Sequence, residues 1–186
     1  MQKTFARVFN YGDDFDVSGK AFDLLLKDGQ VLNAGSLSLK VMFTPGHTPA
    51  CTSFLIEDAL FVGDAMFMPD SGTGRCDFPA GSAESLYDSV QKIYSLPDTT
   101  RIFVGHDYQP AGRELCFQTS VGQEKAENIQ LKGSTSKSEF VEFRTKRDAG
   151  LSAPKLLLPS IQVNINAGKL PSVESNGTSY LKIPVK

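Results

Sequence analysis

The chain has 186 residues, of which 40% are hydrophobic, a length that suits one domain with a sizeable core. The formal net charge of −2 gives no basic field, so neither nucleic acid nor a membrane surface is an expected partner. No apolar stretch approaches the roughly 20 residues of a membrane-spanning helix. The three widely spaced cysteines do not suggest a disulfide framework, and together with the lack of an apolar leader they favour a cytoplasmic protein.

The first half of the chain is predicted to contain mostly strands and loops. Over residues 37–43, Leu and Val alternate with Ser and Lys, and this period of two predicts a strand with at least one buried face. The turn-forming sequence Thr44-Pro-Gly46 ends that strand. The other elements expected here are the end of a helix over 3–10, a polar loop over 11–19, strands over 53–57 and 59–62, and a Gly- and Pro-rich loop over 69–81.

The second half is expected to be richer in helices. Ser82 can cap a helix whose first turn contains Glu84, where the helix dipole favours a carboxylate. The remaining elements expected are a buried strand over 101–104, helices over about 118–131 and 138–149, and a tail from 154 with strand-like pieces such as 161–165. Strands separated by helices predict one layered α/β domain over 1–186.

Three of the expected strands end in a glycine that is followed by a residue able to bind a metal ion. The three sequences are Thr44-Pro-Gly-His47, Phe61-Val-Gly-Asp64 and Phe103-Val-Gly-His106. Glycine lets the backbone turn sharply, so the next side chain is presented at the end of the sheet. Two imidazoles and a carboxylate can hold Zn²⁺ or Fe²⁺. A surface role for each histidine and a turn role for the aspartate remain open, because the spacing alone does not decide.

Longer motifs surround these residues. They are Thr44-Pro-Gly-His-Thr-Pro-Ala50, Gly63-Asp-Ala65, Gly72-Thr-Gly-Arg-Cys-Asp-Phe-Pro79, Gly105-His-Asp-Tyr108 and the C-terminal stretch 156–165. Together they resemble the persulfide dioxygenases, or sulfur dioxygenases, of the metallo-β-lactamase superfamily, over essentially the whole chain. The resemblance implies an αββα sandwich, in which two sheets lie face to face with helices outside, and 154–186 as a family-type C-terminal tail.

The resemblance also implies a site and a reaction. His47 and Asp64 match two ligands of a mononuclear non-heme Fe(II), and His106 matches a histidine that lies near the iron and binds a second metal in binuclear relatives. The implied substrates are glutathione persulfide and dioxygen, and the implied products are sulfite and glutathione. A homodimer is also plausible by resemblance.

Three further residues are candidates for the catalytic site. Arg75 either holds an anionic substrate or orders the loop around the site. Asp77 either accepts a hydrogen bond from a metal-bound imidazole or pairs with Arg75. Tyr108 is expected to line the substrate pocket, and Asp107 to fix the backbone beside it.

One family motif has no counterpart in this sequence. Family members carry an upstream His-x-His-x-Asp-His motif whose first histidine is the third iron ligand, whereas this sequence has no histidine before His47. We therefore expect an N-terminally truncated domain, an incomplete first sheet and impaired activity. A leader would lie in the upstream part, so a mitochondrial location is the alternative if the source is eukaryotic.

Two other functions remain open from the sequence. A hydrolase resembling glyoxalase II would cleave a glutathione thioester with two metals, Zn²⁺ among them, but needs more histidines than this chain has. A non-catalytic fragment or pseudoenzyme is the second alternative. The dioxygenase hypothesis requires that the side chains of His47 and Asp64 lie close enough to bind the same ion.

Overall fold

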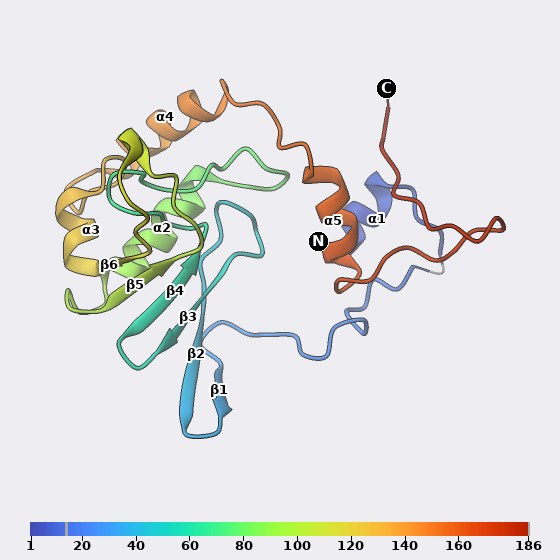
Figure 1. Ribbon diagram of the computed structural model, residues 1–186, viewed down its shortest axis with the longest axis horizontal. Helices are drawn as coiled ribbons and strands as arrows, with labels where there is room; N and C mark the ends of the chain where they lie inside the picture. Colours follow the sequence, from blue (N-terminus) through green and yellow to red (C-terminus); the bar gives the residue numbers. More distant parts are fainter. Residues whose placement is uncertain (14, 186) are drawn as a thin grey trace. The chain divides into compact units, whose positions relative to one another are not determined.

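The computed structural model describes residues 1–13 and 15–185, which form two compact units (Figure 1). Unit 1 consists of Met1–Leu25 with Ser152–Lys186, and unit 2 of Leu26–Leu151. The single domain over 1–186 with a tail from 154 stays a prediction. None of the helices in the described residues has the length and apolar character needed to span a membrane.

The described part of unit 2 is built on a six-stranded sheet in the order β1-β2-β3-β4-β5-β6. The strands are β1 (Val31–Ala34), β2 (Leu37–Phe43), β3 (Thr52–Ile56), β4 (Ala59–Gly63), β5 (Arg101–Val104) and β6 (Gln118–Ser120). Neighbouring strands are antiparallel except β4 and β5, which are parallel. Helix α2 (Ala83–Tyr94) supplies the crossover that a parallel pair needs.

One face of this sheet packs against α2 (Figure 1). The buried cluster joins the sheet residues Met42, Leu60, Val62 and Ile102 to the helix residues Leu86, Val90 and Ile93. The strand predicted over 37–43 is confirmed, but it contributes Met42 to the buried face. Of the alternating apolar residues from which the buried face was predicted, only Val41 is buried. The opposite face keeps apolar side chains partly in solvent, including Leu37, Phe43 and Phe61.

The helix expected over about 118–131 is shorter than predicted. Residues 118–120 form β6, and α3 spans only Val121–Glu127. Ser120 starts α3 by accepting a hydrogen bond from the backbone N–H of Gln123. Asn128 ends it, because its side-chain oxygen accepts hydrogen bonds from the next backbone N–H groups and offers the chain an alternative to helix.

Helix α4 (Lys137–Asp148) and a short 3₁₀ turn η1 (Pro110–Gly112) complete the elements of unit 2. A capping box starts α4: Ser136 accepts from the N–H of Glu139, whose carboxylate accepts from the N–H of Ser136. The sequence analysis missed β1, although Gly35 and Ser36 form the two-residue connection of a β1–β2 hairpin.

Unit 1 contains α1 (Gln2–Val8) and α5 (Leu157–Ile165). The strand-like interpretation of 161–165 was wrong, because these residues belong to α5. Ile165 is buried with Phe5 and Phe9, and Leu158 and Ile161 pack against the same cluster. Leu158, Ile161 and Ile165 thus form one helical face, which a short apolar run alone does not distinguish from a strand.

Candidate metal centre

The turn that carries His47 is fixed by α2. Ser82 donates its backbone N–H to the carbonyl of Gly46 at 2.9 Å, and the hydroxyl of Ser89 donates to the carbonyl of Pro45 at 2.6 Å. A Cβ on Gly46 would lie 2.4 Å from the Cα of Leu86, and its φ of +143° is rarely adopted by residues with a side chain. Glycine at this position therefore lets the turn pack directly on the helix.

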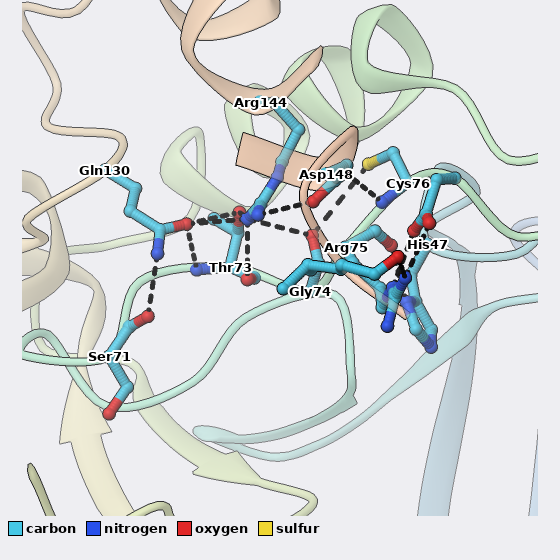
Figure 2. A network of polar contacts seen from close by, with 11 residues as sticks. His47, Ser71, Thr73, Gly74, Arg75, Cys76, Gln130, Arg144 and Asp148 are labelled. Carbon is cyan, nitrogen blue, oxygen red and sulfur yellow. Dashed lines mark hydrogen bonds and ion pairs between the residues drawn. The ribbon is translucent and has the colours of Figure 1, made fainter. Parts of the chain in front are cut away.

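The imidazole of His47 is held in one orientation. Its side chain is 11% exposed, and its Nδ1 lies 2.6 Å from the carbonyl oxygen of Arg75 (Figure 2). Because a carbonyl oxygen only accepts, Nδ1 carries the proton and donates it. Nε2 is then the nitrogen with a lone pair, as in metal-binding histidines whose other nitrogen donates to a backbone carbonyl.

The carboxylate of Asp64 lies between the two histidines. Its Oδ2 is 3.6 Å from Nε2 of His47, and its Oδ1 is 3.3 Å from Nδ1 of His106. Two glycines crowd Asp64. A Cβ on Gly74 would lie 2.1 Å from its backbone oxygen, and a Cβ on Gly105 would lie 3.0 Å from its Oδ1. The structure thus brings together the three residues predicted to bind metal, although their role as ligands stays a prediction.

His106 and Tyr108 form a more exposed side of the site. Nε2 of His106 and the hydroxyl of Tyr108 are 2.8 Å apart, and both rings contact the buried ring of Phe67. Tyr108 is 64% exposed, so it is accessible to a substrate. Partial burial raises the pKa of Tyr108 above its ordinary value.

Arg75 and Asp77 pair with each other through two hydrogen bonds of 2.6 Å. The hydrogen bonds from the guanidinium lower the pKa of the Asp77 carboxyl, and the same bonds raise the pKa of Arg75. The hydrogen bond to the imidazole of His47 involves the backbone carbonyl of Arg75. Of the two alternatives for each residue, the observed contacts correspond to mutual pairing and loop ordering.

Asp107 organises the loop that follows His106. Its carboxylate, shielded from solvent, accepts hydrogen bonds from the backbone N–H of Cys116 and from the guanidinium of Arg113, which also pairs with Asp70. The hydrogen bonds from Arg113 hold the pKa of Asp107 well below its usual range. Asp107 therefore fixes backbone beside the site, as expected.

Sequence reasoning missed a buried polar network behind the loop over 71–77 (Figure 2). Arg144 of α4 donates to the carbonyl of Thr73 at 3.2 Å, to Oε1 of Gln130 at 2.9 Å and to Oδ1 of Asp148 at 2.6 Å. Asp148 also accepts from the backbone N–H of Cys76 at 2.7 Å. The i, i+4 spacing of Arg144 and Asp148 was visible in the sequence, but such pairs usually lie on solvated helix faces.

The donor set fits part of a metal site. Two ligand atoms each about 2.1 Å from one ion lie roughly 3.0–3.5 Å apart, close to the separation of His47 Nε2 and Asp64 Oδ2. The imidazole of His106 approaches the other carboxylate oxygen. Across residues 1–13 and 15–185, no group of three or more His, Cys, Asp or Glu side chains has the arrangement to hold an ion by itself.

Comparison with known families agrees with this geometry. Residues 3–106, which include His47, Asp64 and His106, match the model of the metallo-beta-lactamase superfamily. This chain belongs to that superfamily. Its members bind metal ions, and the mixed α/β fold predicted from the sequence is confirmed.

The relatives within the superfamily include both a glyoxylase and persulfide dioxygenases. Glyoxylase B2 of Dictyostelium discoideum is 53% identical over the whole chain, which spans 64% of that protein. The human mitochondrial persulfide dioxygenase ETHE1 is 41% identical over 82% of the chain and 57% of that protein. The crystal structure of ETHE1 from Myxococcus xanthus superposes with a TM-score of 0.71 at 35% identity, over 83% of the chain and 65% of that structure. The resemblance to persulfide dioxygenases is thus confirmed.

Proposed function

We propose that this chain contributes to a mononuclear non-heme iron site that oxidises glutathione persulfide. The arrangement of His47 and Asp64 carries the proposal: the lone pair of Nε2 and a carboxylate oxygen lie 3.6 Å apart, and a backbone carbonyl fixes the ring. The similarity to the human persulfide dioxygenase supports the choice of reaction within the superfamily. At this separation both donor atoms can bind one and the same ion.

The reaction consumes one dioxygen and one water for each persulfide and yields one sulfite and one glutathione. The outer sulfur is oxidised by four electrons, which reduce dioxygen, and water cleaves the sulfur–sulfur bond. Ferrous iron supplies the redox chemistry, which redox-inert Zn²⁺ does not. Within the chain, His47 and Asp64 would hold the ion, and the exposed Tyr108, hydrogen-bonded to His106, would offer its hydroxyl to the substrate.

The loop carrying Arg75 serves this site through its backbone. Its carbonyl orients His47, and pairing with Asp77 keeps the guanidinium beside Phe78, whose ring lies 4.8 Å from the imidazole of His47. The guanidinium side chain is 17% exposed. We propose that Arg75 shapes the pocket wall, while Asp77 balances its charge and fixes the direction of the guanidinium.

A thioester hydrolase with two metals is the second candidate. It is favoured by the placement of His106 on the second oxygen of Asp64, as expected for a carboxylate shared by two ions, and by the similarity to Glyoxylase B2. On this hypothesis Zn²⁺ would replace iron, and a glutathione thioester would replace the persulfide.

Two measurements separate the candidates. Anaerobic Fe(II) titration followed by NMR should broaden the resonances of His47 and Asp64 together, and Asp64→Asn should weaken binding at least tenfold. With excess Fe(II), oxygen uptake should depend on glutathione persulfide and be lost in His47→Gln, while S-lactoylglutathione should remain intact. Thioester cleavage with Zn²⁺ and no persulfide-dependent oxygen uptake would assign the chain to the hydrolases instead.

A further inference from the structure

We propose that the buried ion pair of Arg144 and Asp148 on α4 is a positioning device for His47. By holding the backbone of residues 73–76, the pair presents the Arg75 carbonyl to the imidazole and so selects the tautomer able to bind a metal through Nε2. This inference rests on the proposed role of His47 as a metal ligand, and it adds two residues to the requirements of that site.

The contacts hold the loop on both sides of Arg75. On the C-terminal side, Oδ2 of Asp148 accepts from the backbone N–H of Cys76 at 2.7 Å. On the N-terminal side, Nη1 of Arg144 donates to the carbonyl of Thr73 at 3.2 Å. The carbonyl of Arg75 lies between these two attachments, so its direction follows from them (Figure 2).

The loop has little room to move away from these attachments. Gln130 accepts from the backbone N–H of Thr73 at 3.0 Å and from Arg144, which ties the same segment to a third point. On the opposite side, Gly74 packs so closely on the backbone of Asp64 that even a methyl group would collide with it. A change in α4 would therefore be transmitted to both proposed ligands.

Stability alone is a weak reason for this pair. Arg144 is 2% exposed and Asp148 is 4% exposed, and burying two charges costs several kcal/mol per ion before their attraction offsets it. Apolar residues of similar volume often stabilise a core as well or better. The ion pair also forms hydrogen bonds with the backbone of the loop, which apolar side chains would not form.

The test is the tautomer of His47 in the metal-free chain, read from long-range ¹H–¹⁵N NMR spectra at alkaline pH. The chain has only two histidines, so His106→Gln assigns the resonances. The wild type should show the Nδ1–H form at His47. In the double variant Arg144→Met/Asp148→Leu, which leaves no unpaired charge, the Nε2–H form should rise several-fold, because free imidazoles favour it.

Matched variants separate positioning from folding. Lys146→Met removes an exposed positive charge from the same helix and should leave the tautomer unchanged. Asp148→Asn keeps the shape but places an amide where the N–H of Cys76 needs an acceptor, so it should give an intermediate shift even if the double variant does not fold. Retention of the wild-type tautomer in the folded double variant or in folded Asp148→Asn would overturn the inference. The measurement uses neither metal nor substrate, so it is independent of the proposed reaction.

Discussion

At the level of single residues, the chemistry of this chain depends on backbone groups as much as on side chains. The carbonyl of Arg75 sets the proton on His47, and Gly74 and Gly105 allow close approach to Asp64. The sequence identified His47, Asp64 and His106 because each follows a glycine at the end of a strand. It did not identify their supports, because a carbonyl has no residue-specific pattern.

Gly74→Ala tests the close packing at Asp64. The new Cβ would lie 2.1 Å from the backbone oxygen of Asp64, so the loop must shift. We expect a loss of about 1–3 kcal/mol in unfolding free energy, measured by urea denaturation, and altered NMR resonances for His47. Gly133→Ala is the control, since its Cβ would meet only ordinary contacts from 3.5 Å. Equal effects of the two variants would contradict the packing explanation.

Glu124 predicts a pH dependence of stability that does not involve the site. Burial raises its pKa to about 8 from 4.5, against the hydrogen bond from Asn128 at 2.7 Å. Between these pH values the folded state keeps a proton that the unfolded chain has lost. The contribution of Glu124 to stability should therefore be complete below pH 4.5 and fall toward pH 8, by up to about 1.4 kcal/mol per pH unit.

Urea unfolding at a series of pH values measures this slope. Glu124→Gln should flatten it, because the amide does not titrate, whereas Glu127→Gln, which changes an exposed carboxylate of the same helix, should not. A slope that persists in Glu124→Gln would show that another group is responsible.

At the level of elements, α2 and α4 position opposite sides of the site. The N-terminus of α2 binds the turn before His47, and α4 binds the loop that contacts the ring of His47. The sequence predicted the N-cap of α2 at Ser82 and a helix over about 138–149. Which loop each helix would hold was not, because those contacts join residues far apart along the chain.

Ser82→Ala tests the N-cap of α2, the helix that holds the His47 turn. The Ser82 hydroxyl accepts from the backbone N–H of Ser85 at 3.1 Å, so its loss should reduce the unfolding free energy by about 1 kcal/mol. Ser82→Thr retains the cap and should stay close to the wild type. Thermal denaturation of the three proteins provides the measurement, and equal loss in both variants would indicate that capping is not the cause.

At the level of the whole molecule, one face of the six-stranded sheet is partly open. Phe61 is 43% exposed and stacks on Phe103, while β1 lies at the sheet edge. Contiguous apolar surface beside an edge strand favours association. The chain spans about two thirds of Glyoxylase B2, so the activity and partners of a longer protein remain proposals.

We expect the 186-residue chain to associate as its concentration rises. Phe61→Thr should weaken association, because it removes apolar area from the sheet face while threonine, a β-branched residue, still suits a strand. Leu170→Thr, an exposed apolar residue of unit 1, is the control. Light scattering across a concentration series would show the difference, and a monomer at all concentrations would refute the expectation.

Iron retention by the 186-residue chain should be low. His47 and Asp64 offer two donors to one ion, and residues 1–13 and 15–185 supply no group of three His, Cys, Asp or Glu ligands. A missing third ligand reduces affinity by about a thousandfold. Metal analysis after desalting should therefore find substoichiometric iron. A full iron load that survives desalting would show that further donors complete the site.

The sequence by itself determined the α/β class, the capped helix after Ser82, the superfamily and the three candidate ligands. These features depend on short-range periodicity and on motifs of a few residues. Only the tertiary structure decided which sheet face is buried, that 161–165 is helical, and that Arg144 and Asp148 support the loop beside His47. The bond from Cys76 to Asp148 joins residues 72 positions apart, and such pairings arise from packing that no local pattern encodes.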